Sequence, residues 1–209
     1  MLFKESDINV NPITNTLHGV ISITWPMVLI SCVVIVGLRI SYLIKNKKKF
    51  VIYKELLSLS FLIYIMCLFQ VVTFQDDVTW SSNNFVPFKE ILRYNMGSRL
   101  FFKNVVGNMV MFLPYGFFIS YYLDSKKLTG PFILTTITSF SIETVQLVIG
   151  RVFDVDDIIL NMLGGTIGFC VYHIIDLFGG KFPKILKNEW FLNILSILLL
   201  VGVLLVILF

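Results

Sequence analysis

Six runs of apolar residues, each about as long as a membrane-crossing helix, alternate with short charged segments along the 209-residue chain. An α-helix needs roughly 20 apolar residues to cross about 30 Å of hydrocarbon. None of the runs shows the alternation of a barrel strand, so each is predicted to be a helix with its backbone satisfied internally. The predicted spans are residues 20–44, 55–75, 104–123, 129–149, 157–178 and 190–209.

The composition agrees with a membrane protein. The chain is 56% hydrophobic and 14% charged, whereas a soluble domain carries roughly 25% charged residues. We expect an all-α fold, a polytopic transmembrane helical bundle that forms a single domain over residues 1–209. The polar first 21 residues lack the basic and apolar regions of a signal peptide. Cys32, Cys67 and Cys170 have no paired spacing, so neither a disulfide framework nor a zinc site is predicted.

The distribution of Lys and Arg predicts the orientation, because short cytoplasmic loops collect these residues. Eleven of the 17 fall on one side of the predicted spans. These are Arg39, Lys45, Lys47, Lys48, Lys49, Lys54, Lys126, Lys127, Lys181, Lys184 and Lys187. That side is expected to face the cytoplasm, with both termini outside. The net charge of +4 then reflects topology and does not indicate nucleic-acid binding.

Polar residues recur at helical spacing in three of the predicted spans, which places them on one face of each helix. The fourth span carries Thr136, Ser139, Glu143, Gln146 and Gly150. The fifth span and the residues just before it carry Asp154, Asp157, Asn161, Gly164, Gly168 and Tyr172. The third begins with Asn104 and Asn108, ahead of Pro114, which would kink the helix. Gly164 and Gly168 would let the fifth span approach a neighbour closely.

The expected topology brings these polar stripes to the same depth, within roughly 10 Å of the outer ends of their helices. A carboxylate in hydrocarbon costs at least about 2.5 kcal/mol and therefore faces the bundle interior and finds partners. We predict a shared polar site in the outer leaflet, in which Glu143 is the most costly member and Arg151 a candidate partner. As an alternative, buried amides only tie helices together, and Asp154 and Asp156 are ordinary solvated loop charges.

The loop before the third span contains NNFVPFKEILRY and is expected to be an interfacial segment or a lid. Its apolar residues could enter the headgroup region while its basic residues meet anionic phosphates. The apolar set is Phe85, Val86, Phe88, Ile91 and Leu92, and the basic set is Lys89, Arg93 and Arg99. A purely structural interfacial helix fits the same pattern.

Three stretches together resemble the VanZ-like family of bacterial membrane proteins: NFVPF, NVVGNMVMFLPYGF and SIETVQLVIGRVFDVDDIILNMLGGTIG. The resemblance covers residues 83–169 and extends to about residue 178. It implies a helical membrane core in a bacterial cell membrane. The family's namesake is associated with low-level teicoplanin resistance without a change in the D-Ala-D-Ala target. A distant kinship with membrane enzymes that exchange lipid head groups has been suggested for the family.

The first functional hypothesis is a site that binds an amphiphile, either a lipid-linked cell-wall precursor or the glycopeptide antibiotic itself. Its polar head would be held by amides and by a guanidinium, which binds phosphate through two parallel hydrogen bonds. The candidate ligand-binding residues are Asn104, Asn108, Gln146, Arg151 and Asn161.

The second hypothesis is an enzyme that exchanges or hydrolyses phosphodiester or pyrophosphate bonds of lipid head groups. Glu143 would be the general base and Arg151 would stabilise charge on the phosphate, with Asp157 beside them. Asp154 and Asp157 could hold a divalent cation, since oxygen ligands suit Mg²⁺ or Ca²⁺. The alternatives are a non-catalytic partner of a cell-wall enzyme and, less favoured because no polar path crosses the predicted bundle, a transporter.

Overall fold

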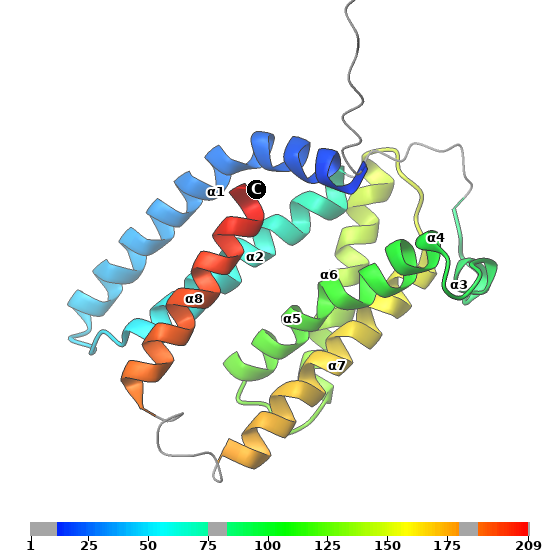
Figure 1. The fold of residues 1–209 in the computed structure, drawn as a ribbon. Helices are drawn as coiled ribbons and strands as arrows, with labels where there is room; N and C mark the ends of the chain where they lie inside the picture. Colours follow the sequence, from blue (N-terminus) through cyan, green and yellow to red (C-terminus); the bar gives the residue numbers. More distant parts are fainter. Residues whose placement is uncertain (1–11, 75–82, 180–187, 209) are drawn as a thin grey trace, which may run out of the picture. The chain divides into compact units, whose positions relative to one another are not determined.

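The computed structural model describes residues 12–74, 83–179 and 188–208, and most of them are helical (Figure 1). The long helices are α1 (Pro12–Lys45), α2 (Ile52–Phe74), α5 (Gly107–Tyr122), α6 (Thr129–Val148), α7 (Val155–Gly179) and α8 (Glu189–Leu208). The short elements are α3 (Lys89–Arg93), α4 (Arg99–Phe101) and the π-helical turn η1 (Phe102–Val106), which leads into α5. The all-α prediction is therefore confirmed.

Among the residues that the structure describes, five helices are long and apolar enough to cross a membrane, as expected for a multi-pass membrane protein. They span Trp25–Lys45, Ile52–Gln70, Arg99–Tyr122, Thr129–Val148 and Val155–Phe178. These segments confirm five of the predicted runs. The sixth run corresponds to α8, whose apolar part within the described side chains is shorter, Glu189–Gly202. The first helix starts at Pro12, eight residues before the predicted boundary, because hydropathy marks the apolar part of a helix and not its polar first turns.

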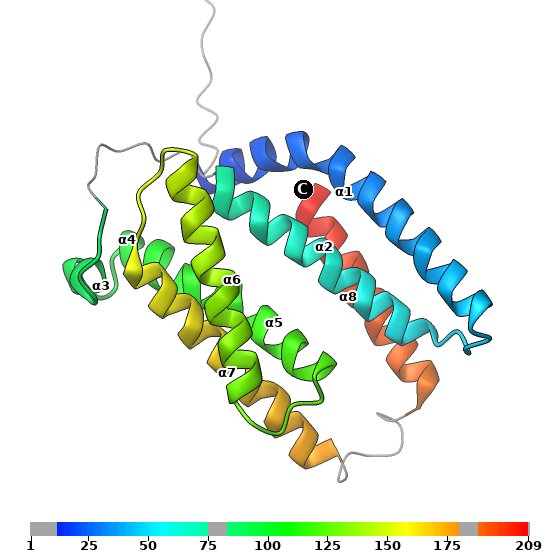
Figure 2. The same ribbon diagram turned by 180° about the vertical axis from the view of Figure 1, so that it is seen from behind.

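The helices form two compact units, a division that the hydropathy pattern does not indicate. One unit contains residues 1–76 and 192–209, and in it α1, α2 and most of α8 lie alongside one another (Figures 1 and 2). Within this unit the backbone N–H of Tyr53 donates to Asn193 Oδ1 at 3.0 Å, which links α2 to α8. The other unit contains residues 77–191 and holds α3 to α7, with all of the predicted polar stripes.

The closest packing in the second unit is between α5 and α7, which run side by side in both ribbon views (Figures 1 and 2). A Cβ atom at Gly164 would overlap the backbone carbonyl of Met109, and one at Gly168 would overlap that of Leu113. The two glycines therefore let the helix backbones touch, as their spacing predicts.

Aromatic and aliphatic side chains fill the remaining space of this unit. The buried residues include Phe112, Tyr115 and Phe118 on α5, Ile142 on α6, and Leu160, Phe169 and Tyr172 on α7. On α6, Pro131, Thr135, Ser139, Ile142, Glu143 and Gln146 also face inward. The polar stripe of α6 is thus part of the packed face, with Thr135 buried in place of the predicted Thr136.

Candidate functional site

Polar side chains from α5, α6 and α7 meet near the end of the unit that holds the α6–α7 turn. Asn108 Nδ2 donates to Asp157 Oδ1 and connects α5 to α7. Asn161 Nδ2 donates to Ser139 Oγ at 2.9 Å and connects α7 to α6. Glu143 is only 1% exposed, and its Oε2 accepts from the backbone N–H of Asp154 at 2.9 Å. We call the set Asn108, Glu143, Arg151, Asp157 and Asn161 the polar centre.

The acidic and basic members of the polar centre lie within electrostatic range of one another. The charges of Asp157 and Arg151 both act on Glu143, and that of Arg151 also acts on Asp157. Arg151 is half-buried in the α6–α7 turn, and its backbone N–H donates to the carbonyl of Gln146 at 2.8 Å. Buried carboxylates are unfavourable without compensating charge or hydrogen bonds. The guanidinium of Arg151 supplies part of that compensating charge.

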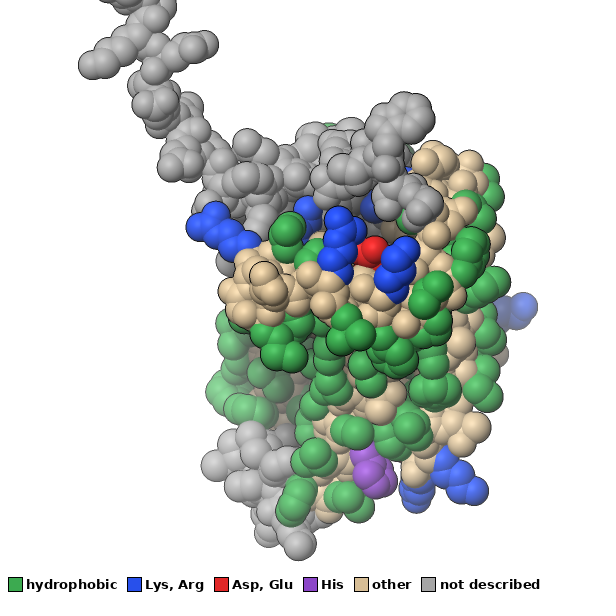
Figure 3. All heavy atoms as spheres, turned by 90° about the vertical axis from the view of Figure 1, so that its right-hand side faces the viewer, with side chains coloured by type: hydrophobic (Ala, Val, Ile, Leu, Met, Phe, Trp, Pro, Cys, Tyr) green, Lys and Arg blue, Asp and Glu red, His purple; other side chains and the backbone are tan. Residues whose placement is uncertain are grey.

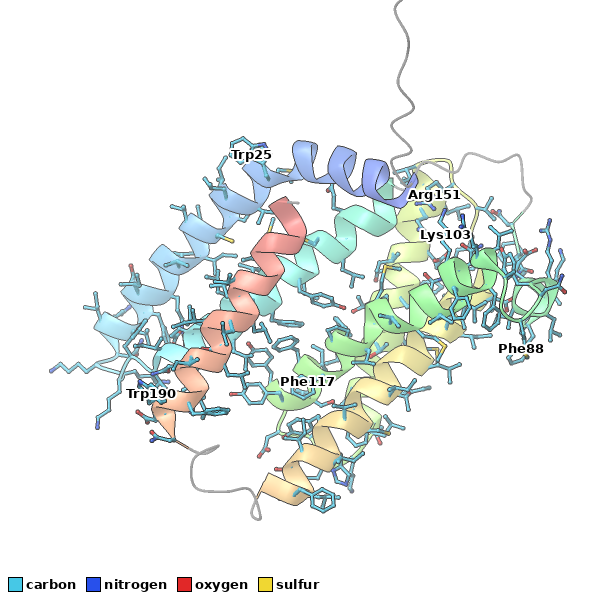
Figure 4. The ribbon with its side chains drawn as sticks, in the orientation of Figure 1. Trp25, Phe88, Lys103, Phe117, Arg151 and Trp190 are labelled. Atoms are coloured by element: carbon cyan, nitrogen blue, oxygen red, sulfur yellow. The ribbon has the colours of Figure 1, made fainter. Side chains whose placement is uncertain are left out.

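Basic side chains gather at this end of the unit. Arg151 and Lys103 both lie there in the side-chain view, at the α6–α7 turn and the start of the α4–α5 helical run (Figure 4). The space-filling view shows Lys and Arg side chains around an acidic one, next to a broad band of hydrophobic side chains (Figure 3). This arrangement is typical of a membrane surface at the level where lipid phosphates meet the acyl chains.

One buried polar atom of the polar centre is not satisfied. Asn161 is 4% exposed, and its Oδ1 has no hydrogen-bond partner among the residues that the structure describes. Most buried polar atoms in proteins are paired with protein groups or with ordered water. An open acceptor beside Ser139 therefore offers a hydrogen-bonding position to a water molecule or a ligand.

Asp154 fastens the α6–α7 turn to the loop before α3. Its Oδ1 accepts from Asn84 Nδ2 and from the backbone N–H of Asp156, both at 2.8 Å. The backbones of Asn84 and Asp154 also form an isolated parallel β-bridge. Burial raises the pKa of the Asp154 carboxyl above its ordinary value, while its hydrogen bonds from Asn84 and Asp156 act in the opposite direction.

Asp156 holds the same loop. The residue is 1% exposed, and its carboxylate accepts backbone N–H groups of Phe88, Glu90 and Ile91, the latter two at 2.7 and 3.1 Å. Phe88 has a φ of 65°, in the left-handed region that side chains other than glycine seldom adopt. We call these three hydrogen bonds the Asp156 clasp. The clasp shows that Asp156 is not the solvated loop charge that one reading of the sequence allowed.

The other predicted ligand-binding residues take different places. Asn104 lies in the π-helical turn η1, and its Nδ2 donates to the hydroxyl of Tyr94 at 2.8 Å. This hydrogen bond joins Asn104 to the loop before α4, and not to the carboxylates of the polar centre. Gln146 is buried on α6, and its backbone carbonyl accepts a hydrogen bond from the backbone N–H of Arg151. The π-helical geometry at Asn104 is of a kind often found near functional sites.

The carboxylates predicted as metal ligands are already engaged by protein donors. Asp154 Oδ1 accepts from Asn84 and from Asp156, and Asp157 Oδ1 accepts from Asn108. Among the described residues, no group of three or more His, Cys, Asp or Glu side chains is arranged to hold a metal ion. A divalent cation would therefore have to bind through remaining oxygens of these groups and of its substrate, as Mg²⁺ often does.

Three residues that shape this site, Asn83, Asn84 and Tyr94, were not among the predicted site residues. Asn84 is the first residue of the NFVPF segment, and Asn83 directly precedes it. Asn83 Oδ1 accepts from the Phe153 N–H at 3.0 Å. The position of these two residues at a recognised motif was an available signal. Ser139 belonged to the predicted stripe of the fourth span, and Tyr94 is the last residue of the segment NNFVPFKEILRY that was expected to be interfacial.

Comparison with known proteins places the chain in a family. No curated protein and no solved structure matches it. The family model described as VanZ/LLP1 matches residues 61–176, more than half of the chain. The match includes α3 to α6, the polar centre and most of α7. The chain therefore belongs to the VanZ/LLP1 family.

Proposed function

We propose that the polar centre binds the head group of a cell-envelope amphiphile in the outer leaflet of the membrane. The observation that carries the proposal is the convergence of Asn108, Glu143 and Asp157 from three helices, beside an unsatisfied acceptor on Asn161. Helix ties alone would need no carboxylate as deeply buried as Glu143, because neutral amides supply the same hydrogen bonds at lower cost.

The chemistry of the site indicates the class of ligand. Arg151 would bind a phosphate or carboxylate of the head, and amides of the polar centre would bind neutral donors and acceptors. Exposed apolar side chains on α6, such as Ile137 and Phe140, offer surface for a lipid tail. Family membership, together with the namesake's association with teicoplanin resistance, points to a lipid-linked cell-wall precursor or to a glycopeptide.

The resistance phenotype tests this proposal. In cells whose low-level teicoplanin resistance depends on this chain, Arg151→Ala and Glu143→Gln are expected to lower the inhibitory concentration to that of cells without it. The matched control is Lys126→Gln, which removes an exposed charge in the turn between α5 and α6. All three variants should reach the wild-type level in the membrane. Full resistance in abundant Arg151→Ala and Glu143→Gln proteins would rule the proposal out.

A second candidate, catalysis on a lipid head group, is favoured by the burial of Glu143 close to Asp157. Two neighbouring carboxyl groups in a dry site tend to share a proton, which suits one of them to act as a general base. Arg151 would stabilise charge that develops on the phosphate. A divalent cation between Asp154 or Asp157 and the substrate would add electrophilic assistance.

Turnover separates the two candidates. Purified protein is incubated with radiolabelled polyprenyl phosphates, polyprenyl diphosphates or phospholipids, with and without Mg²⁺ or Ca²⁺. An enzyme should release or exchange the head group, and Glu143→Gln should abolish turnover while retaining binding of the same lipid. If the wild-type protein binds a lipid from the panel without converting it, binding alone is the function.

A further inference from the structure

A shallow hollow lies in the segment that joins α3 to α4. Its volume is about 390 Å³, within the range of small-molecule sites, and it is lined by Arg93, Tyr94, Asn95, Ser98 and Leu100. These residues offer a guanidinium, a phenol, an amide and a hydroxyl around one open space. No member of the polar centre lines this hollow, and the inference drawn from it does not depend on the proposed function.

Hydrogen bonds at both ends hold the walls of the hollow in place. On one side the Asp156 clasp fixes the turn of α3 that ends at Arg93. On the other, Ser98 Oγ accepts from the Phe101 N–H at 3.1 Å at the start of α4. Tyr94 receives the hydrogen bond from Asn104 at 2.8 Å, which leaves its hydroxyl proton able to donate to a ligand. The hollow is thus preorganised and offers donors.

Large apolar side chains of the same segment are exposed. Leu92 is 81% exposed, Met96 90% and Leu100 58%. Exposed apolar residues interspersed with Lys and Arg are the pattern of a segment that lies in the interfacial layer of a bilayer. The apolar span of α4, η1 and α5 begins at Arg99, so the hollow directly precedes the point where the chain enters hydrocarbon.

From this combination we propose that the hollow binds the phosphodiester head group of an anionic phospholipid in the leaflet that borders α3 and α4. Arg93 would take the phosphate oxygens through its guanidinium, while Tyr94, Asn95 and Ser98 would hydrogen-bond the rest of the head. Leu92, Met96 and Leu100 would lie against the upper acyl chains. Lys89 and Arg99 on the same segment supply further positive charge and favour an anionic over a zwitterionic lipid.

A carboxylate already competes for the guanidinium. Arg93 Nη1 lies 3.1 Å from Glu90 Oε2, and the Arg93 side chain is 71% exposed. An exposed ion pair of this kind contributes little to stability, so a phosphodiester can displace it. Glu90 then sets the affinity of the hollow, because removal of its charge would free Arg93 for the lipid.

Amide hydrogen exchange of the full chain in lipid nanodiscs tests the proposal. Discs of phosphatidylcholine are compared with discs of an equal mixture of phosphatidylcholine and phosphatidylglycerol. The amides of residues 94–101 should exchange about fivefold more slowly in the mixed discs, the effect of one basic residue near an anionic surface. Arg93→Gln should remove the difference, Glu90→Gln should retain or enlarge it, and Lys126→Gln should leave it unchanged.

Two results would overturn the proposal. One is equal exchange of residues 94–101 in both kinds of disc for the wild-type chain, or a persisting difference in folded Arg93→Gln protein. The other is equal slowing by inorganic phosphate in phosphatidylcholine discs, which would make the hollow a site for free anions. Folding of each variant is checked by its melting temperature, and Arg93→Gln should match the wild type because the replaced side chain is exposed.

Discussion

The residue that most changes the interpretation of the sequence is Asp156. In the run DVDD, Asp154 and Asp157 were candidate site residues, and the alternative interpretation was that Asp154 and Asp156 are solvated loop charges. Asp156 instead accepts three backbone hydrogen bonds from α3 and the residue before it. Its position could not be deduced from spacing, because the donors are 65 to 68 residues away and are backbone groups.

We expect Asp156→Asn to destabilise the fold. An amide offers one acceptor oxygen and turns its NH₂ group toward backbone donors, so at least one hydrogen bond to a charged group is lost, at about 1.5–3 kcal/mol. The melting temperature of the purified protein should fall, and the amides of residues 88–91 should lose their protection from exchange. Asp176→Asn, at an exposed position on the same helix, is the control and should leave both unchanged. Retained protection at residues 88–91 in Asp156→Asn would disprove the clasp.

At the scale of elements, the interface between α5 and α7 rests on glycine. Replacing Gly164 with alanine drives a methyl group into the backbone of Met109, which cannot move as a side-chain tip can. We expect Gly164→Ala to destabilise the protein by about 1–3 kcal/mol, the range for overpacking. The measurement is thermal unfolding in detergent.

The matched control is Gly37→Ala on α1, where an added Cβ meets nothing within 4 Å. Alanine is the better helix former, so this variant should be neutral or stabilised by about 0.5–1 kcal/mol. Equal melting temperatures for Gly164→Ala and the wild type would contradict the close approach of α5 and α7.

The helices themselves were largely predictable, because hydropathy and length determine which segments can cross hydrocarbon. Helical spacing also identified the inward faces of α6 and α7, including the buried residues Glu143, Gln146 and Asn161. Spacing did not indicate the hydrogen bond of Asn104 to Tyr94, because it placed Asn104 on the same helical face as Asn108. A π-helical turn at Phe102–Val106 shifts the helical phase between them, and the sequence pattern contains no signal for such a turn.

At the scale of the molecule, the expected orientation follows only from the Lys and Arg distribution. It predicts that the α6–α7 turn and the α3 loop face outward and that the α5–α6 turn faces the cytoplasm. In a background where Cys32, Cys67 and Cys170 are replaced by serine, an impermeant maleimide should label Lys89→Cys in intact cells. Lys126→Cys should be labelled only after permeabilisation. The reverse pattern would invert the topology and move the proposed site to the inner leaflet.

We infer that the polar centre is a binding site and not a set of ties between helices. Sequence reasoning found its members Asn108, Glu143 and Asp157 because buried charge in an apolar chain is costly and therefore conspicuous. It could not determine whether a ligand can reach them, since that depends on how three helices pack.

The most direct test is an experimental structure in lipid nanodiscs that contain an added polyprenyl diphosphate lipid. We expect head-group density in contact with Arg151 and with Asn108 or Asn161, and loss of that density in Arg151→Ala. Side chains of the polar centre packed only against one another and against water, with the lipid absent from the site, would contradict this inference.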